Sequence, residues 1–288
     1  MKILGMICSS RKMGNSEIAV KAALMGAREA GADIAMIRLT DYRIEPCRGC
    51  MTCVFKKAPC PIRDDAHRVY ETLLEYDGLV LCTPTYILGP TGILKTFLDR
   101  GMGFMYGYGR KLEGRPALSM ATAGIPGWEP YALPMNALFL RALGYTILDQ
   151  FMVYGQGPGE AIYHQETLER ARARGKAMVE HMARGKVDYL GEEAPTSCPY
   201  CHNNLLLFTG GTKVKCPNCG IVGQLTIKGD QARVDWEPTP DRWIEEEVIR
   251  HFEHQVLPSG PRFMENRREI REKTAVYRQF QVPGTQGE

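Results

Sequence analysis

Short apolar runs alternate with longer amphipathic segments over the first two thirds of the chain. The short runs are typical of buried β-strands, whereas apolar residues that recur every three or four positions indicate one buried face of a helix. Their alternation predicts a parallel sheet covered by helices on both faces. We expect strands at 2–8, 32–39, 78–83, 116–123 and 145–155, and helices at 17–31, 64–77, 92–98, 128–143 and 164–185, with Pro134 breaking the helix at 128–143.

Five strands in this rhythm predict an α/β fold with a doubly wound, five-stranded parallel sheet of the flavodoxin-like kind, in the order 2-1-3-4-5. Ligands bind to such sheets outside the carboxyl ends of the strands. The stretches SSRKMGNS (9–16), TPTYILGPTG (83–92) and ATAGIPG (121–127) each leave a predicted strand at that end. We therefore expect these three loops to converge on one edge of the sheet.

The composition changes after Gly185, and it predicts four parts. Residues 1–185 form the flavodoxin-like part, 186–196 are a linker, 197–235 are a small zinc ribbon, and 236–288 are a helical C-terminal extension. Apolar residues recur at helical spacing over 244–257, so this segment should dock on another surface, and a neighbouring subunit is a plausible one.

The overall composition is that of a globular protein. The 288 residues are 44% hydrophobic and 24% charged, which argues against disorder, and a net charge of +3 indicates no partner by itself. The chain starts without a signal-peptide pattern and contains no apolar window of about 18 residues, so we expect a cytoplasmic protein without a membrane span. Cytosolic thiols are kept reduced, so its ten cysteines are better read as metal ligands or redox groups than as disulfides.

Four cysteines crowd into the stretch EPCRGCMTCVFKKAPCP, at Cys47, Cys50, Cys53 and Cys60. Three ligands at two-residue gaps, with a fourth followed by Pro61, are similar to the bacterial ferredoxin run that binds a 4Fe-4S cluster. Zinc sites usually pair two C-x2-C knuckles instead. The spacing favours the cluster over zinc or bare thiols, which stay open as alternatives.

A second group comprises Cys198, Cys201, Cys216 and Cys219, which form two C-x2-C knuckles around a hairpin-length insert. This pattern is typical of a structural zinc ribbon, with a single rubredoxin-like iron as the alternative. Residues 197–235 carry four Lys or Arg against two Asp, a net charge of +2. That charge is small for a phosphate-binding surface, so we do not expect nucleic acid as a partner.

The loop SSRKMGNS places hydroxyl, amide and guanidinium groups at the start of a predicted helix: Ser9, Ser10, Arg11, Asn15 and Ser16. Free backbone N–H groups and the helix dipole favour a phosphate there. The loop is neither a Walker motif nor a G-x-G-x-x-G fingerprint. Taken alone, it could equally be an ordinary polar turn that caps a helix.

The stretches KILGMICSSRKMGNS, PCRGCMTC, DGLVLCTPTYILGPTGILKTFLDR and LEGRPALSMATAGIPGWE resemble the NAD(P)H-dependent FMN reductase superfamily, most closely its iron-sulfur flavoprotein branch. The resemblance covers about residues 1–185 and implies FMN and a 4Fe-4S cluster at the first cysteine group. It implies that the first loop holds the FMN phosphate, that the second wraps the flavin ring and that the third borders it. The residues implied in the second and third loops are Pro84, Thr85, Tyr86, Ile87, Gly89, Thr122, Ala123 and Gly124.

The chain departs from the family pattern at Cys8 and Ser10 in the first loop and at Cys82 before T-P-T-Y. Cys8 and Cys82 should end neighbouring strands beside the flavin edge. The favoured interpretation is a pair of small buried apolar residues. The alternative hypothesis is a redox-active or substrate-contacting thiol pair.

A cluster passes single electrons, whereas a flavin accepts one or two. We therefore expect an oxidoreductase that connects a one-electron carrier with a two-electron donor or acceptor. Ferredoxin or NAD(P)H is the expected electron donor and a small molecule the acceptor, and the family resemblance implies a homo-oligomer. The alternatives are an NAD(P)H-dependent FMN or quinone reductase and, in another class, a redox-sensing regulator that uses the ribbon to bind nucleic acid or protein. The sequence identifies no general acid or base.

Overall fold

The computed structural model describes residues 1–107 and 112–280. It divides into two compact units, residues 1–248 and 249–288, which we describe separately. The predicted division into four parts stays a prediction.

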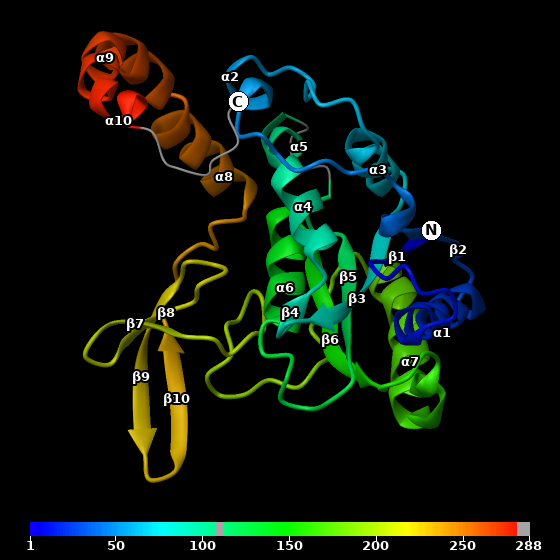
Figure 1. Cartoon of the computed structure of the whole chain (residues 1–288). Helices are drawn as coiled ribbons and strands as arrows, with labels where there is room; N and C mark the ends of the chain where they lie inside the picture. Colours follow the sequence, from blue (N-terminus) through cyan, green and yellow to red (C-terminus); the bar gives the residue numbers. More distant parts are fainter. Residues whose placement is uncertain (108–111, 281–288) are drawn as a thin grey trace. The chain divides into compact units, whose positions relative to one another are not determined.

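A parallel sheet in the order β2-β1-β3-β5-β6 forms the centre of the first unit (Figure 1). This is the predicted order 2-1-3-4-5, because the extra strand β4 is a two-residue antiparallel addition to β3. The strands are β1 (Lys2–Ile7), β2 (Asp33–Arg38), β3 (Gly78–Tyr86), β4 (Gly89–Pro90), β5 (Pro116–Ala123) and β6 (Thr146–Tyr154).

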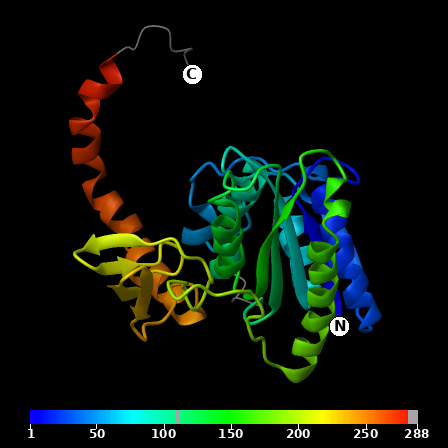
Figure 2. The same ribbon diagram turned by 90° about the horizontal axis from the view of Figure 1, so that it is seen from below.

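Helices cover both faces of this sheet, as the alternating pattern predicts (Figure 2). One face is packed by α1 (Asn15–Glu29) and α7 (Gln165–Arg184), and the other by α3 (Ala66–Leu74), α4 (Gly92–Arg100) and α6 (Ala132–Ala142). The helices α1 and α7 approach closely at two glycines. A Cβ atom on Gly26 would lie 1.8 Å from the Arg172 carbonyl oxygen, and one on Gly175 would lie 1.8 Å from that of Ala23. Only glycine allows this spacing.

The helix α6 differs from the prediction, because Pro134 does not break it. The helix begins at Ala132, so the proline occupies the first turn. Backbone N–H groups in a first turn have no partner within the helix, and a residue without an N–H is tolerated there.

The second cysteine group belongs to an antiparallel sheet in the order β10-β9-β8-β7, which follows a linker after α7. Its strands are β7 (Leu207–Gly210), β8 (Lys213–Lys215), β9 (Val222–Lys228) and β10 (Gln231–Trp236). We call residues 197–243 the ribbon. The four buried cysteines of the ribbon pack in the same hydrophobic cluster as Phe139, Leu140 and Tyr145, so the ribbon shares the core of the flavodoxin-like part.

Polar contacts fasten the ribbon and the linker to this part. Arg141 on α6 donates from Nε and Nη2 to Asp241 Oδ2, at 3.0 and 2.7 Å, and the Asp241 side chain is completely buried. The edge strand β6 is contacted as well: Leu190 N–H donates to the Leu148 carbonyl at 2.7 Å, and Gln150 Nε2 donates to the Cys201 carbonyl at 3.2 Å. A free strand edge invites pairing with other chains, and these segments cover it.

The remaining elements are short helices and the C-terminal segment. They comprise α2 (Thr52–Phe55), α5 (Met102–Gly107), the 3-10 turns Leu39–Asp41 and Glu160–Tyr163, α8 (Glu245–His251), a π-helical turn (Phe252–Val256), α9 (Ser259–Lys273) and α10 (Ala275–Gln279). The helix expected at 244–257 is therefore present as α8 with its π-helical continuation. Within the described ranges, we find no helix with the length and apolar character to cross a membrane.

Candidate functional site

The loops that follow β1, β3, β5 and β6 surround one pocket at the carboxyl edge of the sheet. Its cavity volume is about 150 Å³, and it opens to solvent. Ten of the thirteen predicted cofactor residues line it, while exposed Ser10, buried Gly89 and Ile87 at a hairpin tip do not. The lining residues are Ser9, Arg11, Gly14, Asn15, Ser16, Pro84, Thr85, Tyr86, Thr122, Ala123, Gly124, Gly155, Gln156 and Pro158.

Sequence reasoning missed Gly14, Gly155, Gln156 and Pro158. The last three follow β6, whose carboxyl end lies at the same edge as those of β1, β3 and β5. The rule that placed the first three loops at this edge therefore also applied to this fourth loop.

A buried ion pair between Glu17 and Arg38 holds the first loop in place. Glu17 Oε2 accepts hydrogen bonds from the Met13 backbone N–H at 2.7 Å and from Arg38 Nη2 at 2.6 Å, and Lys21 Nζ lies 2.6 Å from Glu17 Oε1. Arg38, on β2, also donates to the carbonyl oxygens of Ser9 and Arg11. Burial by itself would raise the pKa of Glu17, but the hydrogen bonds from Lys21, Met13 and Arg38 lower it to about 2.

Asn15 connects the first loop with the loop after β6. Its Nδ2 donates to the Gly155 and Gly157 carbonyls, at 2.9 and 3.1 Å, and its Oδ1 accepts from the Ala161 N–H at 3.0 Å. These bonds occupy the side-chain amide, so the structure gives Asn15 a loop-organising role. The first backbone N–H groups of α1 have no partner inside the helix and lie at the same pocket.

Buried hydroxyl groups shape the wall of the pocket. The buried Ser16 hydroxyl lies 3.1 Å from Thr122 Oγ1, which joins the first and third loops. The buried Thr85 Oγ1 has no hydrogen-bond partner in the described part of the chain. A buried hydroxyl without a partner is costly, so it marks a place where a ligand can supply an acceptor or donor.

The second loop is a tight hairpin with a strained tip. Thr85 pairs with Pro90 and Tyr86 with Gly89, so Ile87 and Leu88 are the two central residues of the turn. Both have positive φ, +47° and +67°, as two-residue hairpins of type I′ require. A β-branched residue rarely adopts this conformation, and Ile87 is also 97% exposed. Backbone strain of this kind clusters at ligand contacts.

Cys8 and Cys82 lie on adjacent strands, as expected, and the Cys8 N–H donates to the Cys82 carbonyl at 3.1 Å. Cys8 directly follows β1, but Cys82 does not end its strand as predicted, because β3 continues to Tyr86. Both side chains are buried. Burial, and then the nearby Cys82, raises the pKa of the Cys8 thiol far above its usual range, and burial raises that of Cys82 to about 12. Protonated thiols are poor nucleophiles, so the structure favours the interpretation as small buried apolar residues.

The first cysteine group lines a single cavity. Cys47, Cys50, Cys53 and Cys60 all border it, together with Arg100 from α4. Burial and then the neighbouring Cys60 raise the pKa of Cys53, so negative charge on these sulfurs is mutually unfavourable until a positively charged centre binds. Arg100 Nη2 donates to Cys60 Sγ at 3.3 Å.

The second cysteine group is tighter and fully enclosed. The sulfurs of Cys198, Cys201, Cys216 and Cys219 all lie within 4.8 Å of one another, and each residue is completely buried. Tetrahedral coordination with metal–sulfur bonds of about 2.3 Å requires sulfur–sulfur distances of about 3.8 Å. The Cys201 and Cys216 sulfurs are 3.6 Å apart, so the geometry fits one tetrahedral metal ion.

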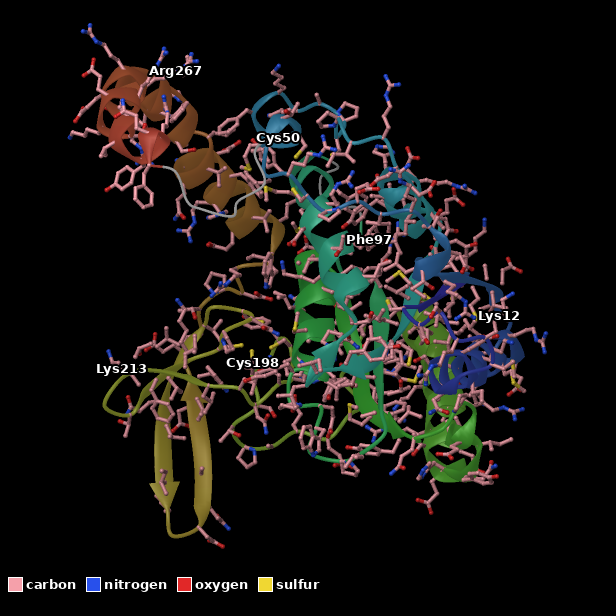
Figure 3. All side chains as sticks on the ribbon, viewed as in Figure 1. Lys12, Cys50, Phe97, Cys198, Lys213 and Arg267 are labelled. Atoms are coloured by element: carbon pink, nitrogen blue, oxygen red, sulfur yellow. The ribbon has the colours of Figure 1, made fainter. Side chains whose placement is uncertain are left out.

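The surroundings of these sulfurs support a metal. Asn203 Nδ2 donates to Cys201 Sγ at 2.7 Å, and the Cys219 N–H donates to Cys216 Sγ at 3.4 Å. Hydrogen bonds among the sulfurs lower the pKa of Cys216 and raise that of Cys219, so the four thiols cannot all ionise without a cation. Cys50 and Cys198 lie well apart in Figure 3, so the two cysteine groups are separate sites.

A third cavity, of about 450 Å³, lies between β6, the linker and the ribbon. Two of its polar atoms, Glu129 Oε2 and Gln150 Oε1, are buried and have no hydrogen-bond partner within the described ranges. Glu129 Oε1 accepts a hydrogen bond from Tyr154 Oη at 2.9 Å. On another wall, the rings of Tyr189 and His202 are stacked with centroids 3.6 Å apart.

Comparison with known families decides which class of protein this site belongs to. The family of NADPH-dependent FMN reductases matches residues 1–151, more than half of the chain. The chain belongs to this family. An iron-sulfur flavoprotein of Archaeoglobus fulgidus is 32% identical over 181 residues, which cover 62% of this chain and 80% of the relative. The resemblance to the iron-sulfur flavoprotein branch is thereby confirmed, and the chain is a flavin-dependent oxidoreductase.

Two further relatives extend beyond the FMN reductase part. A flavone synthase of Aspergillus candidus is 27% identical over 268 residues, which cover 82% of this chain and 81% of the relative. The solved structure of a flavone reductase superposes with a TM-score of 0.81 at 22% identity and covers the whole of both chains. At this identity the second comparison supports the fold alone, and that fold includes the C-terminal part.

We predict that Glu17→Gln changes how stability depends on pH. The pKa of Glu17 is about 2 in the folded protein, below the ordinary 4.5, so its charge stabilises the fold fully above pH 4.5. This contribution is lost as the pH falls from 4.5 towards 2, because Glu17 binds a proton less readily in the folded state than in the unfolded state. Urea unfolding of Glu17→Gln should therefore differ most from wild type near neutral pH and converge with it in acid.

Glu71→Gln on α3 is a suitable control, since that side chain is 56% exposed. It should leave the pH profile of wild type unchanged. A Glu17→Gln profile that runs parallel to that of wild type down to pH 2 would contradict the assignment.

We also predict that Ile87→Asn stabilises the protein, because Ile87 has a φ of +47° at the hairpin tip. Asparagine tolerates positive φ, so relief at the tip should contribute about 1 kcal/mol.

Thermal unfolding measures this effect. Ile227→Asn is the matched control, because Ile227 is 64% exposed within β9 and is not among the described residues with positive φ. It should bring no such gain in stability. Equal effects of the two substitutions on the melting temperature would contradict relief of strain at Ile87.

Proposed function

We propose that this oxidoreductase transfers electrons between a one-electron carrier and a two-electron partner through FMN and a 4Fe-4S cluster. The cluster is held by Cys47, Cys50, Cys53 and Cys60, and FMN lies in the pocket at the carboxyl edge of the sheet. The observation that carries the proposal is the convergence of four cysteines from one short loop on one cavity, in a chain of the iron-sulfur flavoprotein branch.

The two cysteine groups differ in the way that separates a cluster from a single ion. Among the described residues, the sulfurs of the four ribbon cysteines all lie within 4.8 Å of one another. The sulfurs of the four loop cysteines share a cavity but are spaced more widely than this. A cube needs ligands more widely spaced than one tetrahedral ion does, because each sulfur binds a different iron. This supports a cluster in the loop and a single ion in the ribbon.

The residues of the flavin pocket suit an FMN phosphate and ring. Backbone N–H groups at the start of α1, the Ser9 hydroxyl and Arg11 would bind the phosphate. The unpartnered hydroxyl of Thr85 would form a hydrogen bond with the flavin, and Gly124, which lacks a side chain, would let the backbone approach the ring. When bound, FMN supplies chemistry with either one or two electrons, and the protein orients it.

One helix connects the two proposed sites. The N-cap of α4, Thr91, donates its N–H to the carbonyl of the pocket residue Pro84, and the last residue of α4, Arg100, donates to Cys60. A nine-residue helix is about 14 Å long. Figure 1 lets the reader follow α4 from β4 towards α5 and α2. A rigid element of this length sets a fixed separation between the two electron carriers.

The ribbon is proposed to hold zinc in a structural role, because its four buried thiolates leave no open coordination position. Reduced ferredoxin or NAD(P)H is proposed as the donor, a small molecule as the acceptor, and a homo-oligomer as the assembly.

Metal content tests the central proposal. Anaerobically purified protein should contain about four irons and one zinc per chain. Cys53→Ser should lose iron and keep zinc, whereas Cys216→Ser should lose zinc, because each site depends on its own thiolates. About two zincs and no iron would overturn the cluster and leave a two-electron flavin reductase.

A second candidate concerns the acceptor, which we propose to be a planar, hydroxylated aromatic ketone of the flavone type. The relative named as a flavone synthase covers 82% of this chain, so its match extends past residues 1–185 into the C-terminal part. The third cavity involves that part, and its unpartnered acceptors Glu129 Oε2 and Gln150 Oε1 suit phenolic hydroxyl donors. Its stacked Tyr189 and His202 offer an aromatic surface.

Binding of a hydroxylated flavone, followed by calorimetry, tests this candidate. Glu129→Gln should weaken binding about tenfold, because a charged acceptor is replaced by a neutral one. Glu166→Gln, on an exposed position of α7 outside the cavity lining, is the control and should bind like wild type. Wild-type protein that binds no flavone would exclude this class of acceptor without affecting the metal content.

A further inference from the structure

We infer that Arg100 sets the reduction potential of the cluster proposed at Cys47 to Cys60, through the hydrogen bond from Nη2 to Cys60 Sγ. The inference rests on the proposed cluster and adds to it a residue outside the cysteine motif. The donor is 3.3 Å from the sulfur, and the Arg100 side chain is only 2% exposed. A cation held this close in a buried place is weakly screened, so it acts strongly on the charge of the neighbouring thiolate.

Arg100 is held by both ends of the cysteine loop. Nη1 donates to the Glu45 carbonyl at 2.8 Å, two residues before Cys47. Nη2 donates to Asp64 Oδ1 at 3.0 Å, four residues after Cys60, and Nη1 also donates to Asp64 Oδ2. Asp64 Oδ2 in turn accepts from the Glu45 N–H at 2.7 Å, so the pair closes the base of the loop.

One donor of this guanidinium stays unused. Arg100 Nε is buried and has no hydrogen-bond partner in the described part of the chain. Arg100 borders the cavity of the four cysteines and a second cavity of about 230 Å³ that Cys53 and Cys60 also line. A buried donor without a partner between two cavities is the arrangement expected beside an absent anionic group, which a sulfide-rich cluster bound by thiolates would be.

Asp64 and Arg100 should therefore have opposite effects on the cluster. Adding an electron makes the cluster more negative, so the positive charge of Arg100 favours the reduced form. The Asp64 carboxylate offsets part of that charge, and its own pKa stays below the ordinary value because the hydrogen bonds from Arg100, Glu45 and Ala66 outweigh its burial. Loss of a hydrogen bond from a charged donor should change the reduction equilibrium roughly tenfold.

The test is equilibrium reduction of the cluster against a redox dye, followed by its visible absorption and by iron content per chain. We expect Arg100→Met to lower the equilibrium constant for reduction about tenfold and Asp64→Asn to raise it. Arg100→Lys keeps the charge without the planar fork and should lower it by less. Arg43→Gln is the matched control, because Arg43 is 74% exposed and paired with Glu45 at the same loop, and it should behave like wild type.

The outcomes separate tuning from a merely structural role. If Arg100→Met takes up no iron, the other two variants test the inference. Arg100→Lys should then lower the equilibrium constant for reduction, and Asp64→Asn should raise it. Shifts of Arg100 and Asp64 variants in the same direction, or an equilibrium unchanged from that of Arg43→Gln, would overturn the inference while leaving the cluster in place. Wild-type protein without iron would instead overturn the proposed cluster, and the inference with it.

Discussion

A parallel sheet requires every strand to be followed by a return of the chain, so all carboxyl ends of its strands lie at one edge. In this protein the loops after β1, β3, β5 and β6 consequently form one pocket. The helix α4 follows β3 and leads away from that edge, and its last residue, Arg100, donates a hydrogen bond to Cys60 in the cysteine loop. The arrangement of the proposed flavin pocket and of the proposed cluster therefore follows from the direction of the strands.

Buried arginine–carboxylate pairs hold the irregular segments in place around this sheet. Arg38 and Glu17 brace the first loop, Arg100 and Asp64 close the cysteine loop, and Arg141 and Asp241 fasten the ribbon. Arginine suits these places because its planar fork can satisfy a carboxylate and backbone carbonyls together. Loops with little regular hydrogen bonding gain fixed positions in this way, which a site for a cofactor requires.

The ribbon is an integral part of the first unit. Its buried cysteines share a hydrophobic cluster with residues of α6, and its backbone and the linker bond to β6. A metal that orders the ribbon therefore also supports the cover over the edge of the main sheet. This explains in physical terms why a metal site without an open coordination position is useful to a redox enzyme.

The sequence by itself determined the alternation of strands and helices, their order in the sheet and the two cysteine groups, because hydrophobic period and ligand spacing are local properties. It also placed most of the pocket residues, since strand ends converge in any such sheet. It could not place Pro134 inside a first turn, Asn15 across the pocket on the loop after β6, or the tip of the hairpin at Ile87 and Leu88. Those features depend on contacts between segments far apart in the chain, as do the roles of Arg38, Arg100 and Arg141, whose partners only the tertiary structure brings within hydrogen-bonding distance.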